Sequence, residues 1–215
     1  MPNHAPIPPA SSALLIIDMQ RDFCSPGGYA DRAGLDIDPF RAIIPNIRNL
    51  RAAAREVGML TIFTREGHLP DLSDCPAQKL ARSKQAGAEI GTPGPLGKLL
   101  VRGEYGQDII DELAPSGDDV VIDKPGYSAF PGTALALVLA ENKIRQLILC
   151  GVTTEVCVHS TLRDAIDRGF YCVTIADSCA SAYPKLHAAA MEMIGVEGGI
   201  FGEVWDAATV LEYLR

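Results

Sequence analysis

Short runs of β-branched and other apolar residues alternate along this chain with longer stretches of helical periodicity. Such alternation is typical of repeated βαβ units, in which helices connect parallel strands. Most of the runs lack strict apolar–polar alternation, as expected for strands covered on both faces. The predicted strands are residues 13–17, 59–63, 119–122, 146–150, 171–175 and, with the weakest pattern, 199–204.

The stretches between the runs predict helices at residues 40–57, 105–113, 133–141, 154–168, 185–195 and 207–214. The expected fold is therefore α/β: one doubly wound domain over residues 1–215, with a six-stranded, mostly parallel sheet and helices on both faces. A chain of 215 residues is long enough to bury such a core. Residues 1–12 are polar and proline-rich, and we expect a disordered tail there.

Residues 67–103 form the one long segment without a predicted element. Pro70, Pro76, Pro93, Pro95 and several glycines interrupt any regular pattern there. A loop of that length inside a domain usually serves a site.

Composition narrows the classes of partner. With 27 acidic against 19 basic residues, the net charge is −8, which disfavours nucleic acid as a partner. No run approaches the roughly 20 apolar residues of a membrane span, and no leader pattern opens the chain, so we expect a cytoplasmic protein without a membrane partner. The six cysteines are then expected to be free thiols. The sequence contains neither a C-x-x-C pair nor clustered histidines, so it does not predict a metal site.

In a doubly wound sheet, ligands bind beyond the carboxyl ends of the strands. Three chemically useful residues follow predicted strands: Asp18, Lys124 and Cys157. We therefore expect a carboxylate, an amine and a thiol to meet in one crevice.

Cys157 has the strongest local pattern. Thr154 can serve as the N-cap of a helix, which places Cys157 in its first turn, where free N–H groups and the helix dipole stabilise a thiolate. The alternative is a small apolar residue packed beneath the helix.

Asp18 and Lys124 suit acid–base chemistry beside such a thiol. The carboxylate can take the thiol proton and return it to a leaving nitrogen, while the ammonium orients the carboxylate and lowers the thiol pKa. A turn acceptor for Asp18 and a solvated turn lysine for Lys124 are the alternatives.

Three motifs carry a resemblance to a known superfamily: LIIDMQRDF at 15–23, IDKP at 122–125 with SAF at 128–130, and CGVTTEVCV at 150–158. They resemble the isochorismatase-like cysteine hydrolases over residues 13–214. The resemblance implies a catalytic triad of Asp18, Lys124 and Cys157. It also implies a cis peptide between Val152 and Thr153, an oxyanion hole from the N–H groups of Thr153 and Cys157, no metal or organic cofactor, and a homotetramer.

Differences from two members of the superfamily indicate which branch the sequence resembles. Isochorismatase itself lacks the nucleophilic cysteine, and nicotinamidases carry a metal-binding Asp-x-His with a second histidine, which residues 64–72 lack. The string TREGH-x-PDLSD-x-P at 64–76 instead resembles hydrolases of ureido compounds. The resemblance thus predicts cleavage of a C–N bond in a small ureido substrate, biuret or triuret before ureidoacrylate or an N-carbamoyl amino acid, through a thioester.

Several side chains are candidates for contact with that substrate: Gln20, Phe23, Glu66, Phe130 and Glu197. Polar members would accept substrate N–H groups, and the aromatic ones, with Tyr29, would cover a planar substrate. Arg65 is an alternative partner for a substrate carboxylate. A non-catalytic ligand-binding or redox-sensing protein of the same fold is the competing reading.

Overall fold

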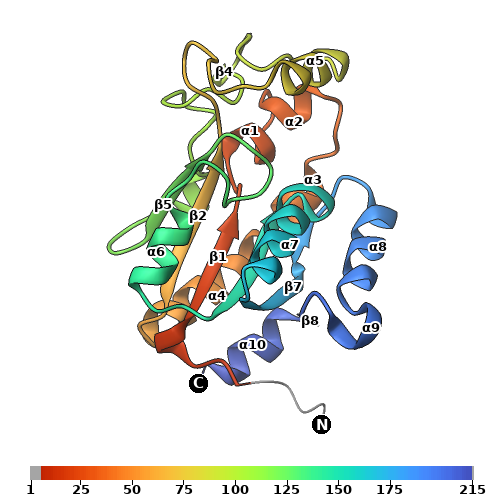
Figure 1. Ribbon diagram of the computed structural model, residues 1–215. Coiled ribbons are helices and arrows are strands. Elements are labelled where there is room, and N and C mark those ends of the chain that lie inside the picture. The colour runs from red at the N-terminus through yellow and green to blue at the C-terminus, as the bar shows by residue number, and fades with distance from the viewer. Residues whose placement is uncertain (1–5, 215) are drawn as a thin grey trace.

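Six parallel strands form the central sheet of the computed structural model, which describes residues 6–214 (Figure 1). The strand order is β5-β2-β1-β6-β7-β8, and every neighbouring pair is parallel. In chain order the strands are β1 (Ser12–Ile17), β2 (Leu60–Glu66), β5 (Val120–Lys124), β6 (Gln146–Val152), β7 (Tyr171–Ala180) and β8 (Glu203–Trp205). The predicted α/β sheet is confirmed.

The central strands are apolar because both of their faces are covered. Every residue of β1 and β6 is buried. In Figure 1, α6 (Leu135–Glu141) and α7 (His159–Asp167) lie in front of the sheet, whereas α4 (Ile44–Glu56) and α10 (Ala207–Tyr213) pack together behind it. Because helices cover both faces of the sheet, residues on both faces of these strands are apolar and do not alternate with polar ones.

The remaining elements are shorter or lie toward the edges. They are η1 (Pro9–Ser11), α1 (Arg21–Cys24), α2 (Tyr29–Arg32), α3 (Asp38–Ala42), α5 (Ala77–Gln85), η2 (Asp111–Leu113), the π-helix η3 (Thr154–Val158), α8 (Pro184–Ile194), α9 (Val196–Gly199) and the paired two-residue strands β3 (Pro93–Gly94) and β4 (Gly97–Lys98).

The strand order reverses beside β1. The chain proceeds from β1 to β2 and β5 on one side and then returns to β6 on the other. Asp18 follows β1, and Cys157 lies in η3 just after β6, so these two residues flank the reversal. Ligands bind at this position in doubly wound sheets.

One predicted helix is wrong. Within residues 105–113 only the 3-10 turn η2 is helical. The backbone of this segment forms hydrogen bonds with distant segments instead. Gly106 N–H donates to the Leu96 carbonyl, and Ile110 N–H donates to the Met19 carbonyl. Ile109 forms an antiparallel β-bridge with Gln20. These tertiary bonds compete with the helical ones that the local pattern favoured.

The segment 67–103 is less irregular than predicted. It contains α5, which begins after Pro76 and whose last turn leads into Gly87 with φ +81°. Proline can start a helix and glycine can end one, so the same residues that suggested a loop bound this helix. In Figure 1, α5 lies above the carboxyl ends of the strands.

Two further predictions need correction. The last strand is residues 203–205 rather than 199–204, because glycines occupy positive φ at 198, 199 and 202. Of the expected disordered tail, residues 1–5 lie outside the described part. Ile7, however, is buried and Pro9–Ser11 forms η1.

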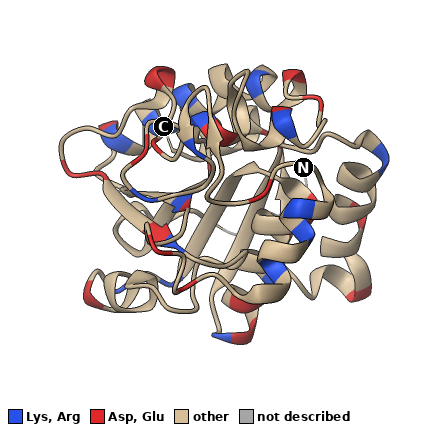
Figure 2. Ribbon diagram, turned by 90° about the horizontal axis from the view of Figure 1, so that it is seen from above, with Lys and Arg blue, Asp and Glu red and all other residues tan. Residues whose placement is uncertain are grey.

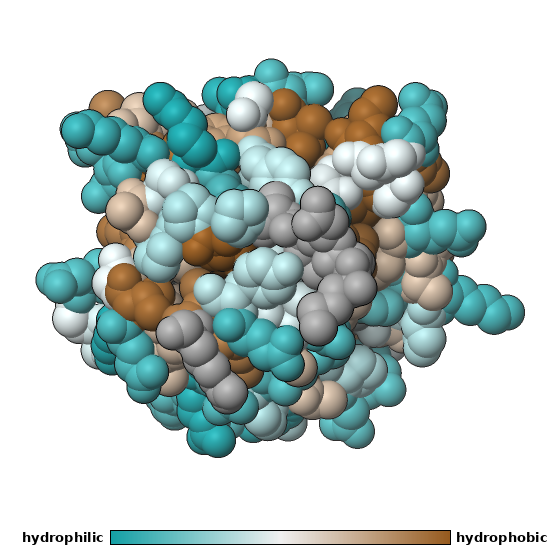
Figure 3. All heavy atoms as spheres, turned by 90° about the horizontal axis from the view of Figure 1, so that it is seen from below, coloured by the Kyte–Doolittle hydropathy of each residue, from teal (hydrophilic) through white to brown (hydrophobic). Residues whose placement is uncertain are grey.

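Charged residues lie mainly in the helices and loops around the sheet, and the middle of the sheet is nearly free of them (Figure 2). At the end opposite α5, hydrophilic side chains surround separate hydrophobic ones (Figure 3). Among the described residues, no helix combines the length and the apolar character that crossing a bilayer requires.

Candidate active site

Asp18 is fixed at the carboxyl end of β1. Its backbone adopts φ +52°, a left-handed conformation that aspartate tolerates better than most residues. Its Oδ1 accepts a hydrogen bond of 2.7 Å from the Thr64 hydroxyl, and the residue has no exposed surface. The carboxylate is therefore buried and held in one orientation.

Lys124 is the last residue of β5 and is also fully buried. Its Nζ lies 2.8 Å from Asp18 Oδ2 and donates to the Gly126 carbonyl at 2.8 Å. The same nitrogen is 3.4 Å from the sulfur of Cys157. Both alternatives from the sequence, a turn acceptor and a solvated lysine, are thereby excluded.

Cys157 lies in the π-helix η3, directly after β6. Thr154 is not the N-cap as expected: Thr153 holds that position without a side-chain bond, and the Thr154 hydroxyl contacts His187 Nδ1 at 2.9 Å. The turn depends on Gly151, whose φ is +116°, because a Cβ there would lie 2.1 Å from the Ile17 carbonyl oxygen. This close approach brings the cysteine next to the end of β1.

The peptide bond between Val152 and Thr153 is cis, as the resemblance implies. Thr153 and Cys157 both border the cavity described below. Their N–H groups remain the predicted oxyanion hole.

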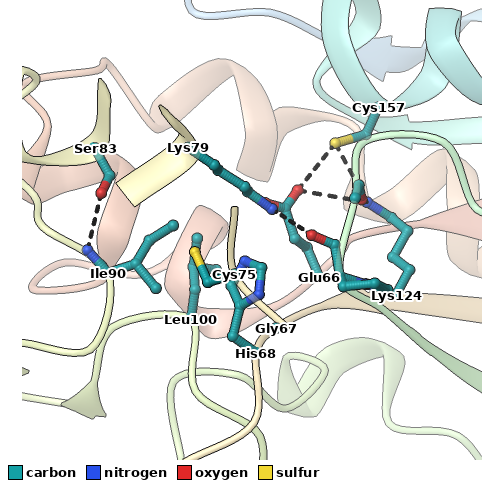
Figure 4. A network of polar contacts seen from close by, with 12 residues as sticks. Glu66, Gly67, His68, Cys75, Lys79, Ser83, Ile90, Leu100, Lys124 and Cys157 are labelled. Carbon is teal, nitrogen blue, oxygen red and sulfur yellow. Dashed lines mark hydrogen bonds and ion pairs between the residues drawn. The ribbon is translucent and has the colours of Figure 1, made fainter. Parts of the chain in front are cut away.

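Glu66, predicted as a substrate contact, is the third charged side chain of this group and also contacts the thiol. It ends β2, and its Oε2 accepts a hydrogen bond from the Cys157 thiol at 3.3 Å and lies 3.4 Å from Lys124 Nζ. Its Oε1 is 2.6 Å from Nζ of Lys79, which comes from α5. Figure 4 shows Glu66 and Lys124 contacting the sulfur and Lys79 reaching toward Glu66.

The two carboxylates titrate in opposite directions. Burial raises the pKa of Asp18, and the ion pair with Lys124 only partly offsets it. Burial also disfavours the charge on Glu66, but Lys124 and Lys79 together outweigh it and lower the pKa of that carboxyl. Asp18 is therefore the more basic of the two, even though the thiol bonds to Glu66.

The thiol itself differs from the prediction. Burial raises the pKa of Cys157 well above its ordinary value, and among the neighbouring charges Lys124 lowers it whereas Asp18 and Glu66 raise it further. The resting group is a thiol rather than a thiolate. Its proton must pass to a neighbouring base at the moment of attack.

Three possible metal ligands lie together here, but their surroundings do not suit a metal ion. One ligand atom each of Asp18, Glu66 and Cys157 lies within 4.8 Å of the others. The Lys124 ammonium already contacts all three, at 2.8, 3.4 and 3.4 Å. A divalent cation would have to displace this buried positive charge, so we derive no step through a metal.

A cavity of about 280 Å³ opens onto the sulfur. Among the predicted contact residues, Phe23, Glu66 and Tyr29 line it. The full lining is Phe23, Tyr29, Leu35, Glu66, Lys79, Arg82, Ser83, Ala86, Ile90, Tyr127, Thr153, Val156 and Cys157. Most of this wall is aromatic or aliphatic.

Three of the predicted substrate contacts lie outside this lining. The Gln20 amide donates to the carbonyls of Glu66 and Gln107 and so ties segments together. Phe130 is buried against Phe170. Glu197 is exposed in α9.

Arg65, the alternative carboxylate partner, is also absent from the lining. It pairs with Asp123 at 2.8 Å and with Asp108 at 2.9 Å. Its guanidinium is therefore already neutralised by two carboxylates of the chain itself.

Helix α5 contributes to the cavity, although none of its residues is among the predicted site residues. Lys79, Arg82, Ser83 and Ala86 all line the cavity, and their spacing places them on one face of a helix. That spacing was visible in the sequence, but the surrounding prolines masked it.

The other cysteines are not part of this group. All six thiols are free, and Cys150 and Cys172 are buried as predicted. Cys24 and Cys179 are buried as well, whereas Cys75 is partly exposed.

A doubly wound parallel sheet with a buried carboxylate, lysine and cysteine at its reversal point is typical of a class of cysteine-dependent hydrolases. Residues 12–209 match the family model described as the Isochorismatase domain, so the chain belongs to the isochorismatase family.

Solved structures agree with this assignment. A cysteine hydrolase from Pseudomonas syringae pv. phaseolicola is 28% identical with a TM-score of 0.83, covering 98% of this chain and 95% of that one. A nicotinamidase/pyrazinamidase from Bacillus subtilis is 27% identical with a TM-score of 0.74, covering 91% and 100%. An N-carbamoylsarcosine amidase from Thermoplasma acidophilum shares the fold at 23% identity and a TM-score of 0.69, covering 92% and 96%.

Proposed function

We propose that the chain hydrolyses a C–N bond of a small ureido compound by nucleophilic attack of Cys157. The observation that carries the proposal is the position of the sulfur, which borders the cavity, lies within 4.8 Å of a carboxylate oxygen of Asp18 and is 3.4 Å from Lys124 Nζ. A nucleophile within reach of a base that is itself oriented by a third group is the arrangement that covalent catalysis needs.

In the first half of the proposed reaction, the thiol proton moves to Asp18 and the sulfur bonds to the substrate carbonyl carbon. The N–H groups of Thr153 and Cys157 hold the oxyanion, a contribution worth about 10²–10³ in rate for one donor. Asp18 then passes the proton to the leaving nitrogen, the C–N bond breaks, and a thioester remains.

In the second half, water replaces the departed amine. Asp18 takes a proton from the water as its oxygen attacks the thioester carbon. The C–S bond breaks, the product acid leaves, and the proton returns to the sulfur. Lys124 stays charged throughout and balances the carboxylate.

Two kinds of ureido substrate are candidates. Biuret or triuret follows from the resemblance of residues 64–76. An N-carbamoyl amino acid is favoured by the cavity, because its aromatic and aliphatic wall suits an apolar side chain and Arg82 stands on its lining without a carboxylate partner among the described residues.

Ammonia release from a substrate panel tests the proposal. The panel holds biuret, triuret, ureidoacrylate, N-carbamoyl amino acids and nicotinamide, each incubated with the wild type and with Cys157→Ser. We expect turnover of at least one ureido compound by the wild type only. Turnover of nicotinamide alone, or none across the panel, would refute the ureido assignment; binding without turnover would favour the non-catalytic alternative.

A further inference from the structure

Lys79 is a buried cation that contacts the charged group around the nucleophile. Its side chain is 9% exposed, and its Nζ lies 2.6 Å from Glu66 Oε1 and donates to the Pro125 carbonyl at 2.7 Å. Pro125 directly follows Lys124. A lysine from α5 therefore binds Glu66, the carboxylate that accepts the hydrogen bond of the Cys157 thiol, as Figure 4 shows.

The charges of this group balance only when Lys79 is included. Asp18 and Glu66 carry two negative charges, and Lys124 and Lys79 carry two positive ones, while the sulfur is protonated. Without Lys79 the same buried group would hold one uncompensated negative charge. In a medium of low polarity such a charge raises the pKa of every acid in the group, the Cys157 thiol included.

The two carboxylates near the sulfur differ in one respect. Each contacts Lys124, but only Glu66 contacts a second ammonium. We propose that Lys79 is a positioning residue that keeps Glu66 ionised, and that it thereby leaves Asp18 as the carboxylate that accepts the thiol proton. This inference rests on the proposed thiol chemistry, and it extends the catalytic group to α5.

The proton balance of the reaction follows from this assignment. When the thiol proton moves to Asp18, the S–H bond breaks, an O–H bond forms, and the total charge of the five side chains stays zero. If Glu66 were already protonated, the acceptor of the thiol at 3.3 Å would be neutral, and the five side chains would carry a net positive charge.

Several other titratable groups face Glu66 and Lys79 from the elements around them. They are Asp18 after β1, Tyr29 of α2, His68 after β2, Cys75 before α5, Arg82 of α5, Lys124 of β5, Tyr127 after β5 and Cys157 of η3. Of these groups, only Lys124 joins Lys79 in contacting the Glu66 carboxylate as a cation.

Alkylation of Cys157 by iodoacetamide tests the inference without any substrate. The rate at a fixed pH near 8.5 follows the thiolate fraction, and peptide mass spectrometry separates Cys157 from the partly exposed Cys75. The variants are Lys79→Met, Lys79→Arg, Glu66→Gln and the double variant Lys79→Met with Glu66→Gln.

Charge balance fixes the expected order. Lys79→Met leaves an excess negative charge and slows alkylation about tenfold, which corresponds to one pKa unit. Glu66→Gln leaves an excess positive charge and accelerates it by a similar factor. Lys79→Arg and the double variant each restore the balance and return the rate to within about threefold of the wild type.

If Lys79 had a purely structural role, Lys79→Met would change the alkylation rate of Cys157 in the opposite direction. If its loss merely displaced α5, water would reach the sulfur, the thiol pKa would fall toward its ordinary value, and alkylation would accelerate. Acceleration in Lys79→Met, or a double variant as slow as Lys79→Met, overturns the inference. If alkylation follows the expected order while no panel compound is hydrolysed, the ureido proposal fails and the role of Lys79 in the charge balance stands.

Discussion

Replacing Lys124 with methionine tests how far the buried charges stabilise one another. Methionine keeps most of the length and volume of lysine but removes the ammonium. Two carboxylates and a thiol then lose the cation that lies 2.8 to 3.4 Å from each of them. Lys79 remains but contacts only Glu66 among the three.

The expected loss is large because Asp18 becomes an unpaired buried charge. Removing one partner of a buried ion pair costs about 3–5 kcal/mol. For a chain of this size, each kcal/mol lowers the melting temperature by about 2–4 °C, so the variant should melt about 6–20 °C below the wild type.

The loss should grow with pH. Burial already raises the pKa of Asp18 above 3.8, and removal of the ammonium raises it further. The native state then keeps a proton that the unfolded chain releases, so stability falls as pH rises from 3.8 toward the native value. The extra increase in the variant extends this interval upward.

Thermal unfolding followed by circular dichroism between about pH 5 and pH 9 measures both effects. Lys185→Met is the matched control, because Lys185 is exposed and lies outside the site. If Lys124→Met melts within about 2 °C of the control at every pH, less than 1 kcal/mol is involved and the buried network is not stabilised as argued.

Three further variants test separate parts of the structure. Cys157→Ser should melt within about 2 °C of the wild type yet lose all measurable ammonia release, because a serine hydroxyl is far less acidic than a thiol; retained turnover would mean that another group attacks. Gly151→Ala should melt about 4 °C lower or more, since its Cβ meets the Ile17 carbonyl, whereas the Cβ of the control Gly195→Ala makes an ordinary contact of 3.8 Å with the Glu192 carbonyl oxygen at φ −83°, and this variant should melt like the wild type. Arg82→Met should raise KM for an N-carbamoyl amino acid about tenfold and leave KM for the corresponding uncharged amide unchanged, and equal effects on both would contradict a carboxylate contact.

Local sequence patterns predicted most of the central sheet. β1 and β6 read clearly as strands because their apolar runs are buried on both faces. The prediction failed where backbone groups bond to distant segments, as at Ile109 and Ile110, which bond across to Gln20 and Met19 rather than along a helix. It also failed at α5, where proline and glycine bound a helix instead of breaking one.

The site divides in a similar way. Asp18, Lys124 and Cys157 were identified because each lies at a strand end and matches a family motif. Gln20 and Phe130 were candidates for substrate contact by residue type alone, and only the packing shows that their side chains bond or stack within the protein. Residue type does not reveal which way a side chain points.

The sequence by itself determined the alternation of strands and helices in a parallel α/β fold. It also determined the three groups that meet at the end of the sheet, because periodicity and strand ends are local properties of the chain. Only the tertiary structure decided the protonation of the site. The pKa of Cys157 rises because burial and two carboxylates outweigh one lysine, and the pKa of Glu66 falls because Lys124 and Lys79, the latter from a separate helix, together outweigh burial. Charges interact through distance and burial, and neither is a property of sequence position.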